Sequence, residues 1–209
     1  MVGAAFARDA ATAAYYEQRA AEYDEWYLGK GRFAVRDRPG WDGEVAELVR
    51  LVRRLEPARA LDIACGSGFL TRHLRGPVVG LDRSPAMALL TRSRIPTGGT
   101  LVGDALALPF PDGSFDRLFT GHFYGHLPTD ERAAFLSEAD RVAGELVVVD
   151  SASRTGAPAE EWQERVLNDG SRHRIYKRYL APARLVAELG GEVVMAGTWF
   201  VAVRAALRP

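Results

Sequence analysis

ALDIACGSGFLTRHL, residues 60–74, is the stretch that decides the fold of this chain. Its apolar run, which ends around Asp62, predicts a buried strand, and the small residues after it predict a tight turn into a helix. Gly66 and Gly68 would let the backbone turn sharply and let a ligand approach closely. We therefore expect a ligand site at the carboxyl end of this strand.

Short apolar runs alternate with helical segments on the carboxyl side of this turn. This alternation predicts an α/β fold of the Rossmann-like, doubly wound class, with a mostly parallel sheet covered by helices on both faces. Strands are expected at 59–64, 78–82, 101–104, 115–120 and 146–150, and helices near 68–75, 84–94 and 129–143.

The last fifty residues follow a different pattern. Residues 158–168 and 182–189 predict helices, and residues 192–196 and 198–204 predict strands joined at Gly197. So short a connection favours antiparallel pairing, so the sheet should end with an antiparallel strand.

The amino-terminal segment predicts a helical cap. Over residues 9–28, Tyr16, Tyr23 and Tyr27 recur at helical spacing on one face, with a loop following at 29–40. A helix is then expected over 41–56. We divide the chain into a cap or lid over 1–40 and a ligand-binding domain over 41–209.

Composition excludes several classes of protein. The chain has 209 residues, 27 basic and 27 acidic side chains, 47% apolar residues and one cysteine. Zero net charge argues against nucleic acid or a membrane surface as partner, and a lone cysteine argues against a disulfide framework. No apolar run is long enough to span a bilayer. We expect a cytoplasmic protein that is a monomer or homodimer.

A second acidic residue indicates the kind of ligand. Asp82 ends the next predicted strand, twenty residues after Asp62, where a carboxylate can accept hydrogen bonds from both ribose hydroxyls of a nucleoside. A dinucleotide fingerprint would place Gly or Ala where Thr71 stands. The negative charge of Asp62 would also repel a pyrophosphate, whereas it would attract a cation such as the ammonium group of S-adenosylmethionine.

In these residues the chain resembles class I S-adenosylmethionine-dependent methyltransferases. Within that family it is most similar to the small-molecule group that includes ubiquinone/menaquinone-type enzymes. LDIACGSG resembles the first motif of that family, with Ala64 in place of its first glycine. VVGLDRSPAM, GDALALPFPDGSFD and FDRLFTGHFYGHL resemble the second, third and strand-4 motifs. The resemblance implies strand order 3-2-1-4-5-7-6, with strand 7 antiparallel.

The resemblance also implies a cofactor, S-adenosylmethionine, and the residues that hold it. Asp62 would meet the amino group, Asp82 the ribose and Asp104 the adenine, while an amino-terminal helix would close over the cofactor with aromatic faces that attract a sulfonium. The full set implied to bind cofactor is Tyr16, Tyr27, Asp62, Ala64, Gly66, Gly68, Asp82, Arg83, Met87, Asp104, Ala105, Thr120 and Gly121.

Methyl transfer requires the nucleophile, methyl group and sulfur to be held in line, and some acceptors also need a base. The candidates are His122, Tyr124 and His126, which follow the fourth predicted strand. His126 could equally pack between loop and helix. No metal is expected, because Asp150 stands without the second carboxylate that a metal-dependent enzyme would need.

The acceptor should be a small molecule. The segment SRHRIYKR, residues 171–178, is either a solvated strand edge or a site for a carboxylate or phosphate on the acceptor. Two other functions remain open: a nicotinamide-dependent oxidoreductase, against which Thr71 and Asp62 speak, and a non-catalytic S-adenosylmethionine-binding module.

Overall fold

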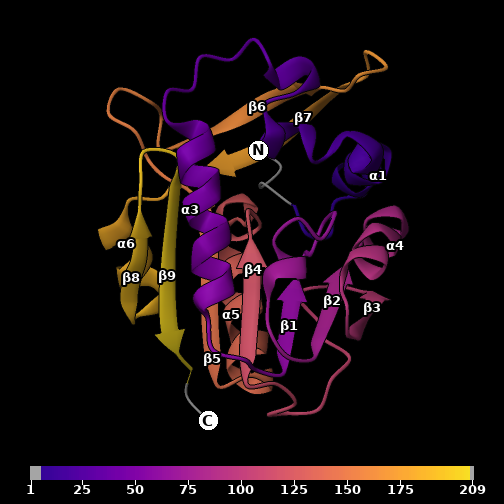
Figure 1. The fold of residues 1–209 in the computed structure, drawn as a ribbon, viewed down its shortest axis with the longest axis vertical. Coiled ribbons are helices and arrows are strands. Elements are labelled where there is room, and N and C mark those ends of the chain that lie inside the picture. The colour runs from indigo at the N-terminus through magenta and orange to yellow at the C-terminus, as the bar shows by residue number, and fades with distance from the viewer. Residues whose placement is uncertain (1–5, 208–209) are drawn as a thin grey trace.

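The fold is built on one seven-stranded sheet with strand order β3-β2-β1-β4-β5-β9-β8 (Figure 1). This computed structural model describes residues 6–207, so residues 1–5 and 208–209 of the two predicted domains lie outside it. All pairings from β3 to β5 are parallel, and β9 is antiparallel to both β5 and β8. The doubly wound sheet and its antiparallel last strand are thereby confirmed. The strands are β1 (Ala60–Ile63), β2 (Val78–Asp82), β3 (Gly98–Val102), β4 (Arg117–Gly121), β5 (Glu145–Ser151), β8 (Glu192–Ala196) and β9 (Phe200–Ala206).

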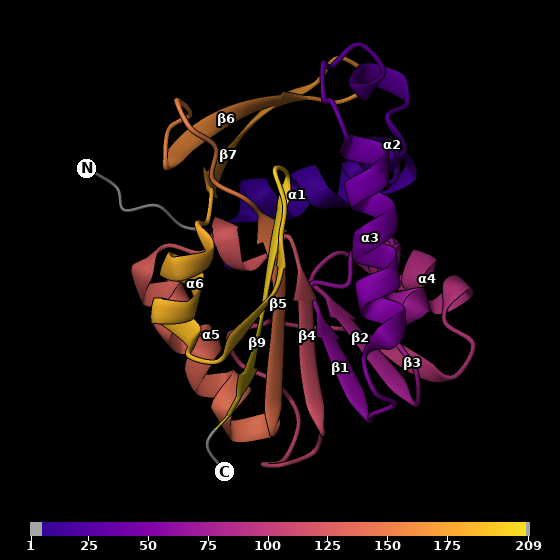
Figure 2. The same ribbon diagram turned by 60° about the vertical axis from the view of Figure 1, so that its left-hand side comes forward.

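Helices cover both faces of the sheet. α3 (Trp41–Arg54) and α4 (Pro85–Arg94) lie on one face, and α5 (Thr129–Val142) and α6 (Pro182–Leu189) lie on the other (Figure 2). Two separate apolar cores result, one on each side. Because side chains alternate along a strand, Leu61 and Ile63 of β1 enter the α5 core, and Asp62 points to the opposite side.

A cap covers the carboxyl ends of the strands. Its lower layer is α1 (Ala10–Arg19) with α2 (Glu25–Leu28), and above it arches a hairpin of β6 (Glu160–Val166) and β7 (Arg172–Arg178) (Figure 2). The cap therefore combines the amino-terminal segment with a hairpin inserted after β5.

Three helix predictions differ from the structure. Residues 158–168 form β6, because the turn at Asn168–Gly170 closes a hairpin in which Trp162 pairs with Tyr176. Residues 68–75 form only one 3₁₀ turn, η3 (Thr71–His73), and the backbone becomes extended at Leu74, where ψ is 143°. The predicted helix over 9–28 is interrupted by a 3₁₀ turn, η1 (Ala20–Glu22).

Candidate functional site

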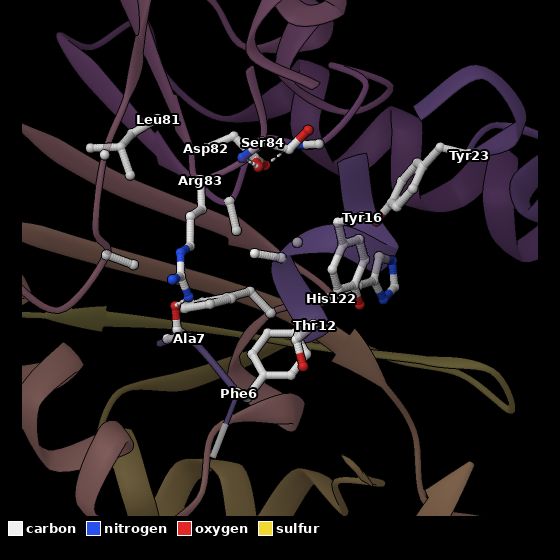
Figure 3. Close-up of a pocket in the computed structure, with 17 residues that line it drawn as sticks. Phe6, Ala7, Thr12, Tyr16, Tyr23, Leu81, Asp82, Arg83, Ser84 and His122 are labelled. Atoms are coloured by element: carbon white, nitrogen blue, oxygen red, sulfur yellow. Dashed lines mark hydrogen bonds between the residues drawn. The ribbon is translucent and has the colours of Figure 1, made fainter. Parts of the chain in front are cut away.

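A cavity of about 70 Å³ lies where the carboxyl ends of β1, β2 and β4 meet the cap (Figure 3). This edge is the usual ligand position in doubly wound sheets, next to the switch in strand order between β1 and β4. Figure 3 shows Tyr16, Tyr23 and His122 gathered toward one side and Leu81 with Arg83 toward the other. The lining residues are Phe6, Ala7, Thr12, Ala13, Tyr16, Tyr23, Ala64, Gly66, Leu81, Asp82, Arg83, Ser84, Gly103, Ala105, Gly121, His122 and Phe123.

The turn after β1 is held by the end of β2. The backbone N–H of Gly66 donates to Asp82 Oδ2 at 2.8 Å, and Asp82 Oδ1 accepts from the N–H of Ser84 at 2.9 Å. Gly68 has a φ of +77°, and a Cβ there would lie 2.9 Å from Thr91 Oγ1. Gly68 thus allows α4 to pack against the turn, rather than lining the cavity itself.

Asp62 provides the most specific feature of the site. Its side chain is buried, and Oδ2 accepts from the Thr71 hydroxyl at 2.6 Å. Oδ1 is buried with no hydrogen-bond partner within residues 6–207. Burial raises the pKa of Asp62 to about 8. An unsatisfied buried carboxylate favours a cationic partner, and a small adjoining space of about 10 Å³, bordered also by Tyr23 and Tyr27, is open to one. The ammonium group of an amino acid-like cofactor fits this chemistry.

The two buried carboxyls predict how stability depends on pH. Burial also raises the pKa of Asp82 to about 6, against about 3.9 for an unfolded Asp. From about pH 4 to pH 8 these two carboxyls bind more protons in the folded chain than in the unfolded chain, so their contribution to stability falls as pH rises. Below about pH 6.5 the histidines act in the opposite direction, because burial lowers the pKa of His73, His122 and His126. We therefore expect the melting temperature of the cofactor-free protein to fall from about pH 6.5 to pH 8 and the slope to flatten in Asp62→Asn. An unchanged slope in that variant would contradict the assignment.

His122 lies just beyond β4 with a φ of +61°, which is unusual for a residue other than glycine. Both ring nitrogens are buried and have no hydrogen-bond partner in the described part of the chain. Burial lowers the pKa of His122 to about 3, so the imidazole is neutral. A neutral ring does not repel a cationic ligand, and both of its nitrogens remain available.

A second and larger cavity, of about 790 Å³, opens on the other side of His122. Tyr16, Tyr23 and His122 line both cavities, so these three residues mark where the two spaces meet. The walls of the larger cavity come from the cap: α1, the loop before α3, and the β6–β7 hairpin. A volume of this size accommodates a small organic molecule.

The remaining candidate residues fall into two groups. Tyr16, Ala64, Gly66, Asp82, Arg83, Ala105 and Gly121 line the first cavity, and Tyr27 and Asp62 line the small space beside it. Four predicted cofactor residues line none of the three spaces: Gly68, Met87, Asp104 and Thr120. Asp104 instead pairs with Arg8 and accepts from the N–H of Leu106. Thr120 donates to the carbonyl of Ile63, and Met87 is a buried residue of α4.

The other two catalytic candidates are placed differently from each other. His126 borders the larger cavity, where its Nδ1 lies 2.5 Å from the carbonyl oxygen of Tyr176 and its ring stacks on Phe6. Tyr124 lines none of the three spaces, and its hydroxyl donates to Glu188 at 2.9 Å.

Several lining residues were not predicted from the sequence. Phe6, Thr12 and Ser84 enter the first cavity, and arginines of the cap enter the second. Phe6 and Thr12 stand in an Ala-rich stretch with no motif. Ser84 could have been found, because it follows Asp82 at the cap position of α4, where it accepts from the N–H of Met87.

Comparisons with known proteins agree with this geometry. Residues 61–145 match the family described as a methyltransferase domain. Demethylmenaquinone methyltransferase of Thermus thermophilus is 39% identical over 114 residues, covering 49% of this chain and 51% of that protein. dTDP-3-amino-3,6-dideoxy-alpha-D-glucopyranose N,N-dimethyltransferase of Streptomyces fradiae is 39% identical over 149 residues, covering 65% and 53%. The chain thus spans about half the length of these curated relatives.

A solved structure extends the likeness to the whole chain. The complex of DhpI with S-adenosylhomocysteine superimposes with a TM-score of 0.72 and 27% identity, covering 95% of this chain and 96% of that one. The chain therefore has the fold of S-adenosylmethionine-dependent methyltransferases, and the matched residues 61–145 cover β1 to the start of β5 of that fold. None of the helices described is long and apolar enough to cross a membrane.

Proposed function

We propose that this protein transfers a methyl group from S-adenosylmethionine to a small molecule. The observation that carries the proposal is Oδ1 of Asp62, which has no hydrogen-bond partner among the described residues. It borders a small space that shares Tyr23, Ala64 and Gly121 with the first cavity, and Tyr23 also lines the larger cavity. When bound, the cofactor supplies an activated methyl group. The relatives and the DhpI structure support this class of reaction, and no comparison supports the oxidoreductase alternative.

Each part of the site has a distinct task in this proposal. Asp62 holds the ammonium group of the cofactor, and Asp82, fixed by Gly66 and Ser84, accepts from the ribose hydroxyls. His122 lines both cavities, and its neutral ring accepts a hydrogen bond from an acceptor hydroxyl or amine and so orients the nucleophile. A pKa of about 3 makes this hydrogen-bonding role a better fit than removal of the proton. The cap excludes water and holds the acceptor in line.

The acceptor in this proposal is a small molecule with an anionic group. From the sequence, the anion site was expected on residues 171–178. In the structure the basic side chains of that segment are largely paired with carboxylates, so the support for an anionic acceptor comes from elsewhere. Arg172 pairs with Glu164, Lys177 with Asp150 and Arg178 with Glu188. Of these three cations only Lys177 borders the larger cavity. Positive charge in that cavity comes mainly from arginines elsewhere in the cap.

Calorimetric titration with S-adenosylhomocysteine and with NAD⁺, followed by transfer of labelled methyl from S-adenosylmethionine into a metabolite extract, tests the proposal. We expect S-adenosylhomocysteine to bind, NAD⁺ not to bind, and label to appear in a low-mass product. Binding of NAD⁺ alone would favour the oxidoreductase. Cofactor binding without any labelled product would favour the non-catalytic module. Either result would overturn the proposal.

A further inference from the structure

A buried arginine with no acidic partner lies in the wall of the larger cavity. Arg19, in the last turn of α1, is only 6% exposed. Its Nη1 donates to the Tyr15 hydroxyl at 2.8 Å, and its guanidinium lies 4.7 Å from the centre of the Tyr23 ring. No carboxylate lies within ion-pair distance of it in the described part of the chain. Arginines so deeply buried nearly always pair with an anion. Arg19 has no such anion among the described residues.

Two more arginines share the surroundings of Arg19. The Tyr15 ring lies 5.6 Å from the guanidinium of Arg19 and 5.9 Å from that of Arg165 on β6. The Phe33 ring lies 5.8 Å from Arg19 and 4.7 Å from Arg36. All three arginines line the larger cavity. Burial and the positive charges of Arg165 and Arg19 lower the pKa of Arg36, as expected for cations held close together.

The acidic residues of the cavity do not neutralise this group. Of the residues described, seven arginines and lysines and four carboxylates line the cavity. Glu164 is paired with Arg172, Glu161 accepts from Tyr179, and Glu22 accepts from the N–H of Asn168. Neither Arg36 nor Arg165 forms an ion pair with a carboxylate within residues 6–207. Arg165 donates to the neutral Gln163 side chain, at 2.9 Å through Nη2 and at 3.3 Å through Nε. The cluster is therefore an uncompensated centre of positive charge.

We propose that Arg19, Arg36 and Arg165 bind a doubly charged oxyanion, a phosphoryl group, on the methyl acceptor. This inference rests on the proposed function, because it identifies the larger cavity as the acceptor site. Three guanidinium groups present several parallel N–H donors, a geometry that matches phosphate oxygens. A dianion offsets the mutual repulsion of three cations better than a single carboxylate does. The aromatic rings around the cluster are left to contact the organic part of the acceptor.

Titration of phenyl phosphate into the full chain saturated with S-adenosylhomocysteine, in a phosphate-free buffer, tests the inference. We expect phenyl phosphate to bind more tightly than benzoate and benzyl alcohol to bind weakest. Arg165→Gln and Arg36→Gln should each weaken phenyl phosphate binding by about 10-fold or more, because each removes charge-assisted hydrogen bonds. Arg19→Lys, which keeps the buried charge, should weaken it by less than these two changes.

Arg184→Gln is the control, because Arg184 is a half-exposed arginine of α6 that lines none of the three cavities. Its partner Glu188 also lies outside the cavities and is still held by Arg178. Its phenyl phosphate affinity should be unchanged. Equal binding of benzyl alcohol, or an equal loss in Arg184→Gln, would overturn the inference. If S-adenosylhomocysteine fails to bind, the proposed function fails, while titration of the cofactor-free chain still tests the arginine cluster.

Discussion

Asp62→Asn should weaken S-adenosylhomocysteine binding by about 100-fold or more while leaving the protein folded. The substitution removes the buried carboxylate that would pair with the ammonium group, and losing one partner of such a pair costs roughly 2–5 kcal/mol. The cofactor-free protein should keep its melting temperature, because Asp62 with a pKa of about 8 is largely protonated at neutral pH and an amide of nearly the same size replaces it. Calorimetry and thermal melting at neutral pH measure the two quantities.

Asp116→Asn serves as the control for Asp62→Asn. Asp116 is also an aspartate next to the sheet, but it forms an exposed ion pair with Arg59 at the opposite ends of the strands. Its loss should leave cofactor affinity unchanged, because an exposed pair contributes little beyond its own neighbourhood. Equal affinity of wild type and Asp62→Asn for S-adenosylhomocysteine would show that Asp62 does not hold the ammonium group.

His122→Ala should lower the rate of methyl transfer by roughly 100-fold, because the nucleophile loses the hydrogen bond that orients it toward the methyl group. S-adenosylhomocysteine affinity should change by less than about 3-fold, because the neutral ring forms no ion pair. Since the pKa of His122 is about 3, the wild-type rate should not vary with His122 ionisation above about pH 5. Single-turnover measurements with labelled cofactor separate the rate from binding.

His126→Asn is the matched comparison. His126 borders only the larger cavity, and its Nδ1 is already engaged by the Tyr176 carbonyl. It should affect the apparent affinity for the acceptor more than the rate of transfer. A larger loss of rate in His126→Asn than in His122→Ala would assign the orienting hydrogen bond to His126 instead.

Local sequence patterns predict the order of the sheet and the edge of it at which the first cavity lies. Asp62 and Asp82 stand at the ends of apolar runs, and those runs became β1 and β2. The register of a parallel sheet then brings their carboxyl ends to one edge, so spacing along the chain predicts proximity in space. The terminal hairpin followed from its short connection at Gly197 in the same way.

The cap was harder to predict, because it depends on contacts between distant segments. EEWQERV in β6 carries charges at helix-compatible spacing, and only its pairing with β7 makes it a strand. The arginine cluster joins Arg19, Arg36 and Arg165 across 146 positions of sequence. The basic residues of 171–178 can be read from the sequence. No local sequence pattern predicts that Glu164, Asp150 and Glu188 pair with them.

A crystal structure of the protein with S-adenosylhomocysteine bound tests the central claim most directly. We predict that the amino group lies within hydrogen-bond distance of Asp62 Oδ1, the ribose hydroxyls contact Asp82, and the sulfur faces His122 and the larger cavity. A complex with the amino group away from Asp62, or with the sulfur directed away from that cavity, would contradict the account.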